Sequence, residues 1–243
     1  MPDDIFEHPR LTAIYDVLEG DRSDLDVYVS AALDTQARDA LDIGCGTGSL
    51  ALLLASRGIV VTALDPAAGS LDVARRKPGA EQIRWVQGYA EDIPELQVDL
   101  VTITGNVAQA IVDDDAWSRT LARIHDVLRP DGSLVFETRI PARTAWTEWN
   151  RRDSFSVRDI PGVGRVESWV ETTGVDGPLV SFRWTYVFAG DGEVLTSDST
   201  VRFREREELE SALVEHGFTV ADIRDAPDRP GREMIFYARP AMS

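Results

Sequence analysis

Three glycines at alternate positions give the strongest chemical signal in this sequence. They lie at 44, 46 and 48 in the segment Ala40-Leu-Asp-Ile-Gly-Cys-Gly-Thr-Gly48, between a predicted strand and a predicted helix. Glycine allows a sharp turn, and without a Cβ it lets a ligand approach the bare backbone. The following helix directs its N-terminus toward such a ligand. Asp65 closes the next predicted strand 21 residues after Gly44. An acid about 20 residues after such a loop binds ribose hydroxyls in nucleotide-binding α/β folds, so the pattern favours a nucleoside site over a ligand-free tight turn.

An acidic residue, Asp42, precedes these glycines, and their spacing is G-x-G-x-G rather than G-x-G-x-x-G. A carboxylate at this place would repel a pyrophosphate, whereas it would attract an ammonium group. The loop is therefore better suited to a nucleoside ligand that carries a cation.

Alternating strands and helices must position this loop. Helices are predicted over 9–19 and after Ser23, which could cap the second. Strands are predicted at 39–43, 59–64, 83–87, 98–104 and 133–138, and helices at 50–57, 70–77 and 115–128. This order predicts right-handed crossovers and a mostly parallel sheet that is covered on both faces. A last helix over 205–216 and two strands at 219–224 and 234–239 complete an α/β, doubly wound sheet of seven strands.

The hydrophobic pattern changes between the fifth strand and the last helix. From about 167 to 204 the chain alternates Val, Thr, Trp, Tyr and Phe with polar residues, and Asp176-Gly177 and Asp191-Gly192 are hairpin-turn dipeptides. We predict a three-stranded antiparallel meander as an insertion. The expected organisation is an N-terminal helical cap at 1–36, a core at 37–139 and 205–243, and an insertion or substrate lid at 140–204.

The glycine loop, Asp65 and the segment Gly88-Tyr-Ala-Glu-Asp-Ile-Pro94 together resemble the class I S-adenosylmethionine-dependent methyltransferases, across about 38–139 and the closing strands. The resemblance implies a Rossmann-like fold and S-adenosylmethionine as cofactor. It puts Asp42 near the methionine amino group, Asp65 on the ribose, and the amides of Ala90 and Glu91 with the Asp92 carboxylate on the adenine edge. The implied cofactor-binding residues are Tyr15, Arg22, Asp42, Gly44, Cys45, Gly46, Gly48, Asp65, Pro66, Ala90, Glu91, Asp92, Thr104, Gly105, Asn106 and Gln109.

Several of these positions have a second interpretation. Asn106 could instead cap the next helix, a position that Asn favours. Arg22, which the resemblance places on the cofactor carboxylate, could instead pair with a neighbouring aspartate of its linker. Cys45 is a small residue that could serve only packing. These alternatives stay open at the level of sequence.

Residues for the methyl acceptor are harder to identify. Glu137 and Arg139 end the fifth strand, where ligands bind in such sheets, although Arg139 could equally be a surface ion-pair partner. Phe182, Trp184, Tyr186 and Phe188 share one face of an alternating strand. That face either packs the insertion onto the core or forms an aromatic lid over a small acceptor. Glu137, Arg139 and Tyr186 are the catalytic candidates, because none of the three histidines is placed to act as a base.

Composition narrows the function. A formal charge of −17, from 42 acidic and 25 basic residues in 243, disfavours nucleic acid as the partner. The single Cys45 suits a reducing cytoplasm, the acidic start MPDDIFEHPR is unlike a signal peptide, and no apolar stretch approaches a membrane span. Glu137-Thr-Arg-Ile replaces the Asp-Asn pair of metal-dependent relatives, so no metal is expected.

The resulting hypothesis is an S-adenosylmethionine-dependent methyltransferase that acts on O or N of a small molecule, by in-line displacement with catalysis by proximity and orientation. The alternatives are a methyltransferase that acts on a protein, and a regulatory subunit that binds the cofactor without turnover. The sequence leaves monomer and homodimer open.

Overall fold

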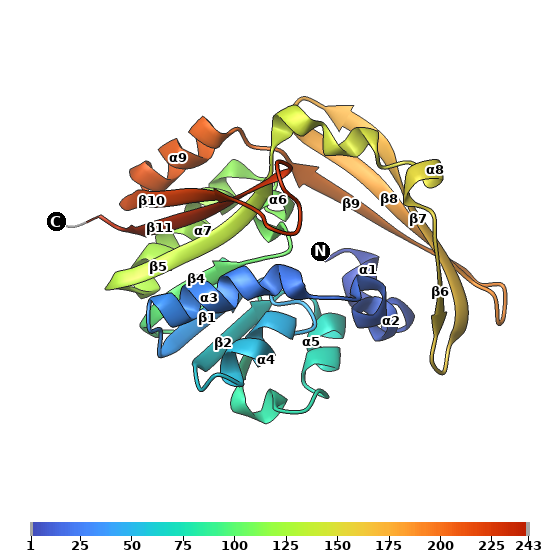
Figure 1. The fold of residues 1–243 in the computed structure, drawn as a ribbon, viewed down its shortest axis with the longest axis horizontal. Coiled ribbons are helices and arrows are strands. Elements are labelled where there is room, and N and C mark those ends of the chain that lie inside the picture. The colour runs from blue at the N-terminus through green and yellow to red at the C-terminus, as the bar shows by residue number, and fades with distance from the viewer. Residues whose placement is uncertain (1, 242–243) are drawn as a thin grey trace.

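The computed structural model describes residues 2–241 and shows two sheets (Figure 1). Positions 1, 242 and 243, at the outer ends of the predicted cap and core, lie outside the described residues. The larger sheet has seven strands in the order β10-β11-β5-β4-β1-β2-β3. Its strands are β1 (Asp39–Ile43), β2 (Val60–Asp65), β3 (Arg84–Gln87), β4 (Val98–Ile103), β5 (Leu128–Arg139), β10 (Phe218–Asp225) and β11 (Glu233–Pro240).

Strands β1 to β5 pair with one another in parallel, and β11 pairs antiparallel with both β5 and β10. The predicted α/β fold with a mostly parallel seven-stranded sheet is therefore confirmed. Strands β1, β4 and β5 end in nearly continuous buried residues, as expected where both faces of a parallel sheet are covered. The strand order switches between β1 and β4, because β2 and β3 follow on one side of β1, and β4 and β5 lie on the other. Such a switch point opens a crevice at the carboxyl ends of the strands.

Helices cover both faces of this sheet. On one face, α7 (Asp114–Val127) and α9 (Arg206–Glu215) pack against β4, β5, β10 and β11 in one hydrophobic cluster. On the other, α3 (Asp26–Asp34), α4 (Ser49–Ala55) and α5 (Ala68–Ala74) pack against β1 and β2. The α7 pattern, with Trp117, Leu121 and Ile124 buried, shows why this helix forms: its apolar residues recur at helical spacing on one side.

The N-terminal segment contains α1 (Asp4–Glu7) and α2 (Pro9–Glu19), which precede the short 3₁₀ turn at Ser23–Leu25 and α3. Pro9 begins α2 at the position where its missing N–H costs nothing, and His8 Nδ1 accepts from the Arg10 amide. Ser23 was expected to cap the next helix, but its side chain makes no cap hydrogen bond and donates to Asp21 instead. That expectation was wrong because a 3₁₀ turn precedes the helix.

The second sheet is a four-stranded antiparallel meander in the order β6-β7-β8-β9. Its strands are β6 (Ser156–Ile160), β7 (Gly164–Asp176), β8 (Leu179–Phe188) and β9 (Val194–Arg202), and a short helix α8 (Arg151–Ser154) precedes them. The predicted meander had three strands, so that prediction missed β6. This edge strand is short and largely exposed, and its sequence has little apolar alternation to reveal it.

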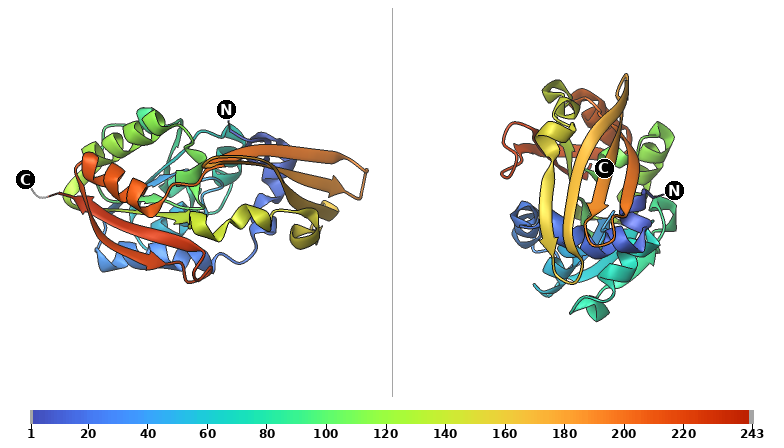
Figure 2. Two further views of the ribbon diagram at one scale, coloured as in Figure 1. Left: turned by 90° about the horizontal axis from the view of Figure 1, so that it is seen from above. Right: turned by 90° about the vertical axis from the view of Figure 1, so that its right-hand side faces the viewer.

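The meander projects from the core and arches over the N-terminal helices (Figures 1 and 2). Tyr186 and Phe188 of β8 pack with Leu11 and Ile14 of α2 in a separate buried cluster. A further cluster joins Phe182 and Phe203 to Trp149, near the start of the insertion. The aromatic face of β8 therefore serves packing along most of its length.

Candidate functional site

A cavity of about 280 Å³ opens at the carboxyl ends of β1, β2 and β4. Its floor comes from the loops after these strands and after β3, and its roof comes from the N-terminal segment and β9. Predicted site residues that line it are Tyr15, Arg22, Gly44, Cys45, Gly46, Asp65, Pro66, Thr104 and Gly105. Residues from five separate segments of the sequence thus meet at one place, the crevice that the strand order predicts.

The three loop glycines have different surroundings. A Cβ on Gly44 would lie 2.6 Å from Val107, and one on Gly48 would lie 2.4 Å from the Trp85 ring, so both positions are closed by packing. Gly46 has a φ of +53° and nothing within 4 Å of where its Cβ would be. Gly46 is therefore the glycine that leaves open space for a ligand, whereas Gly48 lies away from the cavity lining.

Asp65 fixes the glycine loop and also faces the cavity. Its carboxylate accepts hydrogen bonds from the Gly46 and Ala67 amides, each at 2.8 Å. The side chain is only 7% exposed, and burial raises its pKa while these two hydrogen bonds lower it. Each carboxylate oxygen accepts one of these bonds and has a second lone pair. Asp65 can thus shape the loop and bind a hydroxyl at the same time.

Asp42 lies beneath the loop in the middle of the sheet and does not line the cavity. It is fully buried; its Oδ1 accepts from Thr102 Oγ1 at 2.8 Å, and its Oδ2 has no hydrogen-bond partner among the described residues. Burial raises the pKa of this carboxyl to about 7. A buried carboxylate oxygen without a donor is costly, and the arrangement is one that a nearby cation would stabilise.

The N-terminal segment forms the roof. Tyr15 lines the cavity and lies 5.7 Å, between ring centroids, from Phe6, which also lines it. Arg22 lines the cavity too, while its Nε and Nη2 bind the two oxygens of Asp24 at 3.0 Å each. The linker ion pair considered from sequence is therefore present. It does not remove Arg22 from the cavity wall.

Hydrogen bonds fasten this roof to both sheets. Glu7 accepts from the amides of Ala68 and Gly69 at 3.0 and 3.2 Å, at the start of α5. The Ile5 amide donates to Ser197 Oγ of β9 at 3.0 Å. The first helix thereby links the core to the insertion directly over the cavity.

The predicted adenine-edge residues lie just outside the cavity lining. Ala90 is buried, Glu91 is exposed and pairs with Arg119, and Asp92 accepts from the Tyr89 amide at 2.9 Å. Gly88 and Tyr89, immediately before them, line the cavity instead. The side chain of Asp92 here supports the backbone turn, and direct contact of these three residues with a ligand stays a prediction.

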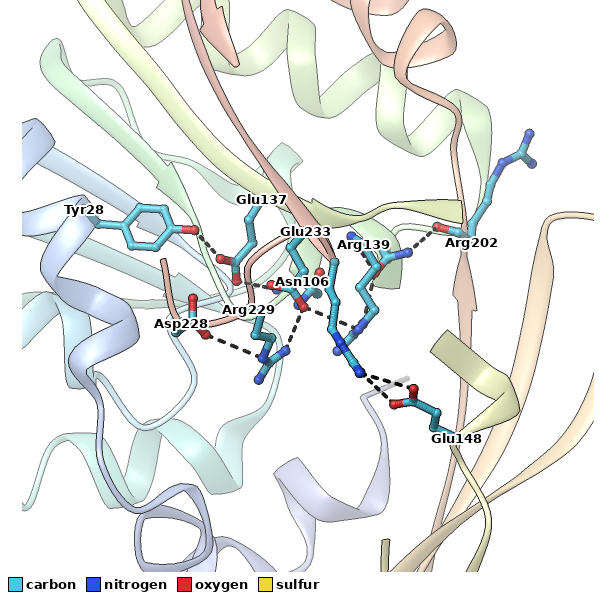
Figure 3. Close-up of polar contacts among 11 residues, drawn as sticks. Tyr28, Asn106, Glu137, Arg139, Glu148, Arg202, Asp228, Arg229 and Glu233 are labelled. Atoms are coloured by element: carbon cyan, nitrogen blue, oxygen red, sulfur yellow. Dashed lines mark hydrogen bonds and ion pairs between the residues drawn. The ribbon is translucent and has the colours of Figure 1, made fainter. Parts of the chain in front are cut away.

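On the β4 side, Asn106 belongs to a buried polar network (Figure 3). It precedes α6 (Val107–Ala110) with a φ of +61°, and its side chain makes no cap hydrogen bond. Asn106 therefore occupies the predicted N-cap position, but its side chain does not cap the helix. Asn106 Nδ2 donates to Glu233 at 3.1 Å, and Oδ1 accepts no bond from the α6 amides. Its Oδ1 is buried and unpartnered within residues 2–241.

Glu137 and Arg139 also belong to this network and lie outside the cavity lining. Glu137 accepts from the Tyr28 hydroxyl and from the Asn106 amide. Arg139 is mostly buried, and this burial lowers its pKa. Its Nη1 donates to Gln109 Oε1 at 3.0 Å, and its Nε lies 3.6 Å from Glu233 Oε1. Arg139 is thus an internal partner rather than a surface one, and Gln109 is engaged with it.

Tyr186, the third catalytic candidate, lies in the packed cluster with α2 and does not line the cavity. It is 2% exposed, stacked on Trp184 at 5.9 Å, and burial raises its pKa far above the usual range. Such a phenol is a poor acid or base at neutral pH.

Sequence reasoning missed several cavity residues. The roof residues Pro2, Asp3, Phe6 and Thr200 come from the ends of elements whose placement only the fold determines, as do Val107, Ala110 and Ile111 beside Gly105. Asp3 accepts from Ser199 Oγ at 2.5 Å, and burial raises its pKa. Thr47, inside the glycine motif, could have been included from its position alone.

Two negative findings concern the part of the chain that the structure describes. It contains no group of three or more His, Cys, Asp or Glu side chains placed to hold a metal ion. No helix within residues 2–241 is long and apolar enough to cross a membrane.

Comparison with known proteins agrees with this geometry. A family model described as a methyltransferase domain matches residues 40–132, from β1 through the β4 loop to β5. By this match, residues 40–132 form a methyltransferase domain. This confirms the resemblance inferred from the glycine loop and the two segments that follow it.

Curated relatives of this methyltransferase domain match only part of the chain. An uncharacterized methyltransferase of Mycobacterium tuberculosis is 36% identical over 52% of the chain and 52% of its own length. The chain spans about half the length of the curated relatives it matches.

Among solved structures, an S-adenosylmethionine-dependent methyltransferase from Clostridium acetobutylicum has a TM-score of 0.76 at 17% identity, covering 96% of this chain and 98% of its own. CalS10, an amino pentose methyltransferase from Micromonospora echinaspora, has a TM-score of 0.70 at 22% identity, over 90% and 92% of the two chains. These matches extend through the insertion, so the whole fold is shared.

Proposed function

We propose that this protein transfers a methyl group from S-adenosylmethionine to a nitrogen or oxygen atom of a small molecule. The observation that carries the proposal is the cavity beside Gly46, with Asp65 in its wall and, beneath its loop, a buried Asp42 whose Oδ2 has no hydrogen-bond partner among the described residues. The matched domain and the likeness of fold support the same activity.

The residues present fit the cofactor. The cofactor is a nucleoside that carries a sulfonium and an ammonium group, and the site offers an open glycine, a hydroxyl-binding carboxylate and a buried carboxyl group whose ionised form a cation would favour. Asp65 would hold the ribose hydroxyls, Arg22 would bind the cofactor carboxylate, and Asp42 would favour its ammonium group through the loop. Once bound, S-adenosylmethionine supplies an activated methyl group with a neutral sulfide as leaving group.

The protein's own contribution is to orient the reactants and to exclude water. The roof of Phe6, Tyr15 and Thr200 closes the cavity on the side of the insertion. Holding two reactants in line within such an enclosure can supply about 7–11 kcal/mol of the barrier. Since Glu137 and Arg139 are engaged elsewhere, the chemistry relies on positioning rather than on a strong base. This arrangement suits an amine acceptor that arrives neutral, or an acidic hydroxyl.

The covering of the cavity favours a small acceptor. The N-terminal segment and β9 lie over the cavity, and a folded protein substrate would have to approach past them. The fold is shared with an amino pentose methyltransferase, and an amino sugar is a class of acceptor that such an enclosure would admit.

Calorimetric titration with S-adenosylhomocysteine tests the binding claim, with Asp65→Ala as the variant and Asp72→Ala, an exposed acid on α5, as the matched control. We expect binding by the wild type and the control and a large loss in Asp65→Ala. Absence of wild-type binding at millimolar ligand, or equal binding by all three, would contradict the proposal.

A second assay separates an enzyme from a cofactor-binding subunit. The protein is incubated with S-adenosylmethionine carrying a labelled methyl group and a panel of small amines and hydroxyl compounds, including amino sugars. Label transferred to a small molecule supports the proposal. Cofactor binding without transfer to any compound would favour a regulatory subunit that binds the cofactor without turnover. A parallel reaction with added protein tests the other alternative, and label found only on that protein would favour a protein methyltransferase.

A further inference from the structure

A buried chain of hydrogen bonds, from Tyr28 of α3 through Glu137 to Asn106, leads to the loop that forms part of the cavity floor (Figure 3). We call these bonds the relay, and the catalytic proposal does not use them. Thr104 and Gly105 line the cavity at the end of β4. The two residues Gly105 and Asn106 are consecutive in the left-handed region, with φ of +67° and +61°. Such a pair is unfavourable for a non-glycine residue, so the surrounding structure must hold it in place.

Glu137 provides that restraint from the neighbouring strand. Its Oε1 accepts from the Asn106 amide at 3.1 Å, and its Oε2 accepts from the Tyr28 hydroxyl of α3. The carboxylate is 8% exposed and Tyr28 is 1% exposed, so solvent does not compete for these bonds. Hydrogen bonds to a charged group in such surroundings are the strong ones.

A second contact restrains the side chain of the same residue. Asn106 Nδ2 donates to Glu233 at 3.1 Å, and Arg229 binds Glu233 at 2.7 Å. Glu233 is 3% exposed and begins β11, so the loop is also tied to the far side of β5. Rotation of the Asn106 amide would bring its oxygen against a carboxylate, which fixes the orientation of the group.

We propose that Tyr28 and Glu137 are positioning residues, which hold the loop Thr104–Asn106 in its left-handed form and thereby set the shape of the ligand cavity. The inference rests on the proposed function, because the cavity is taken as the cofactor site. Neither residue lines that cavity. The relay therefore makes ligand affinity depend on contacts between the N-terminal cap and the sheet.

The test compares Tyr28→Phe, Glu137→Gln and the matched control Tyr237→Phe with the wild type. Tyr237 suits the control because it is a tyrosine of the neighbouring strand β11 whose hydroxyl makes no hydrogen bond to Glu137, Asn106 or Glu233. S-adenosylhomocysteine affinity is measured by calorimetry at a temperature where all four proteins are folded. We expect the two relay variants to bind about threefold to tenfold more weakly than wild type, and the control to stay within about twofold.

A spectroscopic readout separates positioning from a general loss of stability. The backbone amide proton of Asn106 is followed by NMR without ligand. Replacing the carboxylate by an amide weakens its hydrogen bond, so Glu137→Gln should move this signal upfield, and the control should leave it in place. A stability effect alone would lower the unfolding temperature without moving either the affinity or this signal.

The outcomes distinguish the two proposals. If the wild type binds and both relay variants bind equally well, the positioning role is overturned and the proposed function stands. If the wild type does not bind, the proposed function is refuted, and the positioning role falls with it because there is no ligand affinity for Tyr28 and Glu137 to affect. If Glu137→Gln fails to fold, Tyr28→Phe decides, since it removes only one hydroxyl.

Discussion

The buried carboxyl of Asp42 makes the stability of the ligand-free protein depend on pH in a way that one substitution can isolate. The pKa of this group is about 7 in the folded protein against 3.8 for the free side chain, and burial is the main cause. Between these two values the folded protein holds more protons than the unfolded chain. Stability therefore falls as the pH rises through this window.

The magnitude follows from the shift. About three pKa units correspond to about 4 kcal/mol of destabilisation once the group is ionised in both states. Of this, about 2–3 kcal/mol is lost between about pH 5 and about pH 8. Asp42→Asn removes the titration and retains an oxygen that can accept from Thr102 Oγ1.

Urea unfolding of wild type and Asp42→Asn across this pH range is the measurement. Burial also raises the pKa values of Asp65 and Glu137, but both proteins share those groups, so the difference between the curves reports Asp42. We expect the variant to gain about 2–3 kcal/mol relative to wild type from about pH 5 to about pH 8. Parallel curves would refute the reasoning and would mean that water or another group compensates the carboxylate.

Three further predictions concern the cavity, its glycine loop and the Arg22 ion pair. Asp65→Asn should weaken S-adenosylhomocysteine binding at least about tenfold in calorimetry, because a charge-assisted acceptor of the Gly46 amide is lost; unchanged affinity would contradict its role. Gly46→Ala should weaken ligand binding and lower the free energy of unfolding by about 1 kcal/mol. Gly48→Ala should lower the free energy of unfolding more, by about 2 kcal/mol or more in urea, because its Cβ would meet the Trp85 ring. The opposite ranking of stability would show that the loop is arranged differently. Arg22→Ala should weaken binding more than Asp24→Ala, and equal losses would reduce Arg22 to an ion-pair partner.

Local sequence patterns were sufficient to predict the helices and strands of the core. Strand β1 and helix α2 occupy the predicted residues, and the other predicted core elements begin and end within three residues of prediction, except that β5 already begins at Leu128 instead of 133. Apolar residues at strand or helix spacing recur regularly there, and glycine or proline marks the boundaries. The edge strand β6 escaped prediction because an exposed edge needs no such alternation.

Some residues of the candidate site could likewise be predicted from the sequence, and others could not. The glycine loop and Asp65 are separated by short, regular elements, so their spacing alone predicted that they would meet. The roles of Asn106, Glu137 and Tyr28 could not be predicted, because they depend on contacts between residues 31 and 109 positions apart. No short-range signal records such a pairing.

What the sequence by itself determined is the fold class, the loop and its acidic partner, since these follow from backbone freedom and hydrophobic periodicity within about 30 residues. Only the tertiary structure decided which polar residues face the cavity and which are buried in the network behind it. The physical reason is that burial, and with it pKa and hydrogen bonding, depends on where α1, α3 and the meander pack. That packing is set by long-range contacts rather than by the local chain.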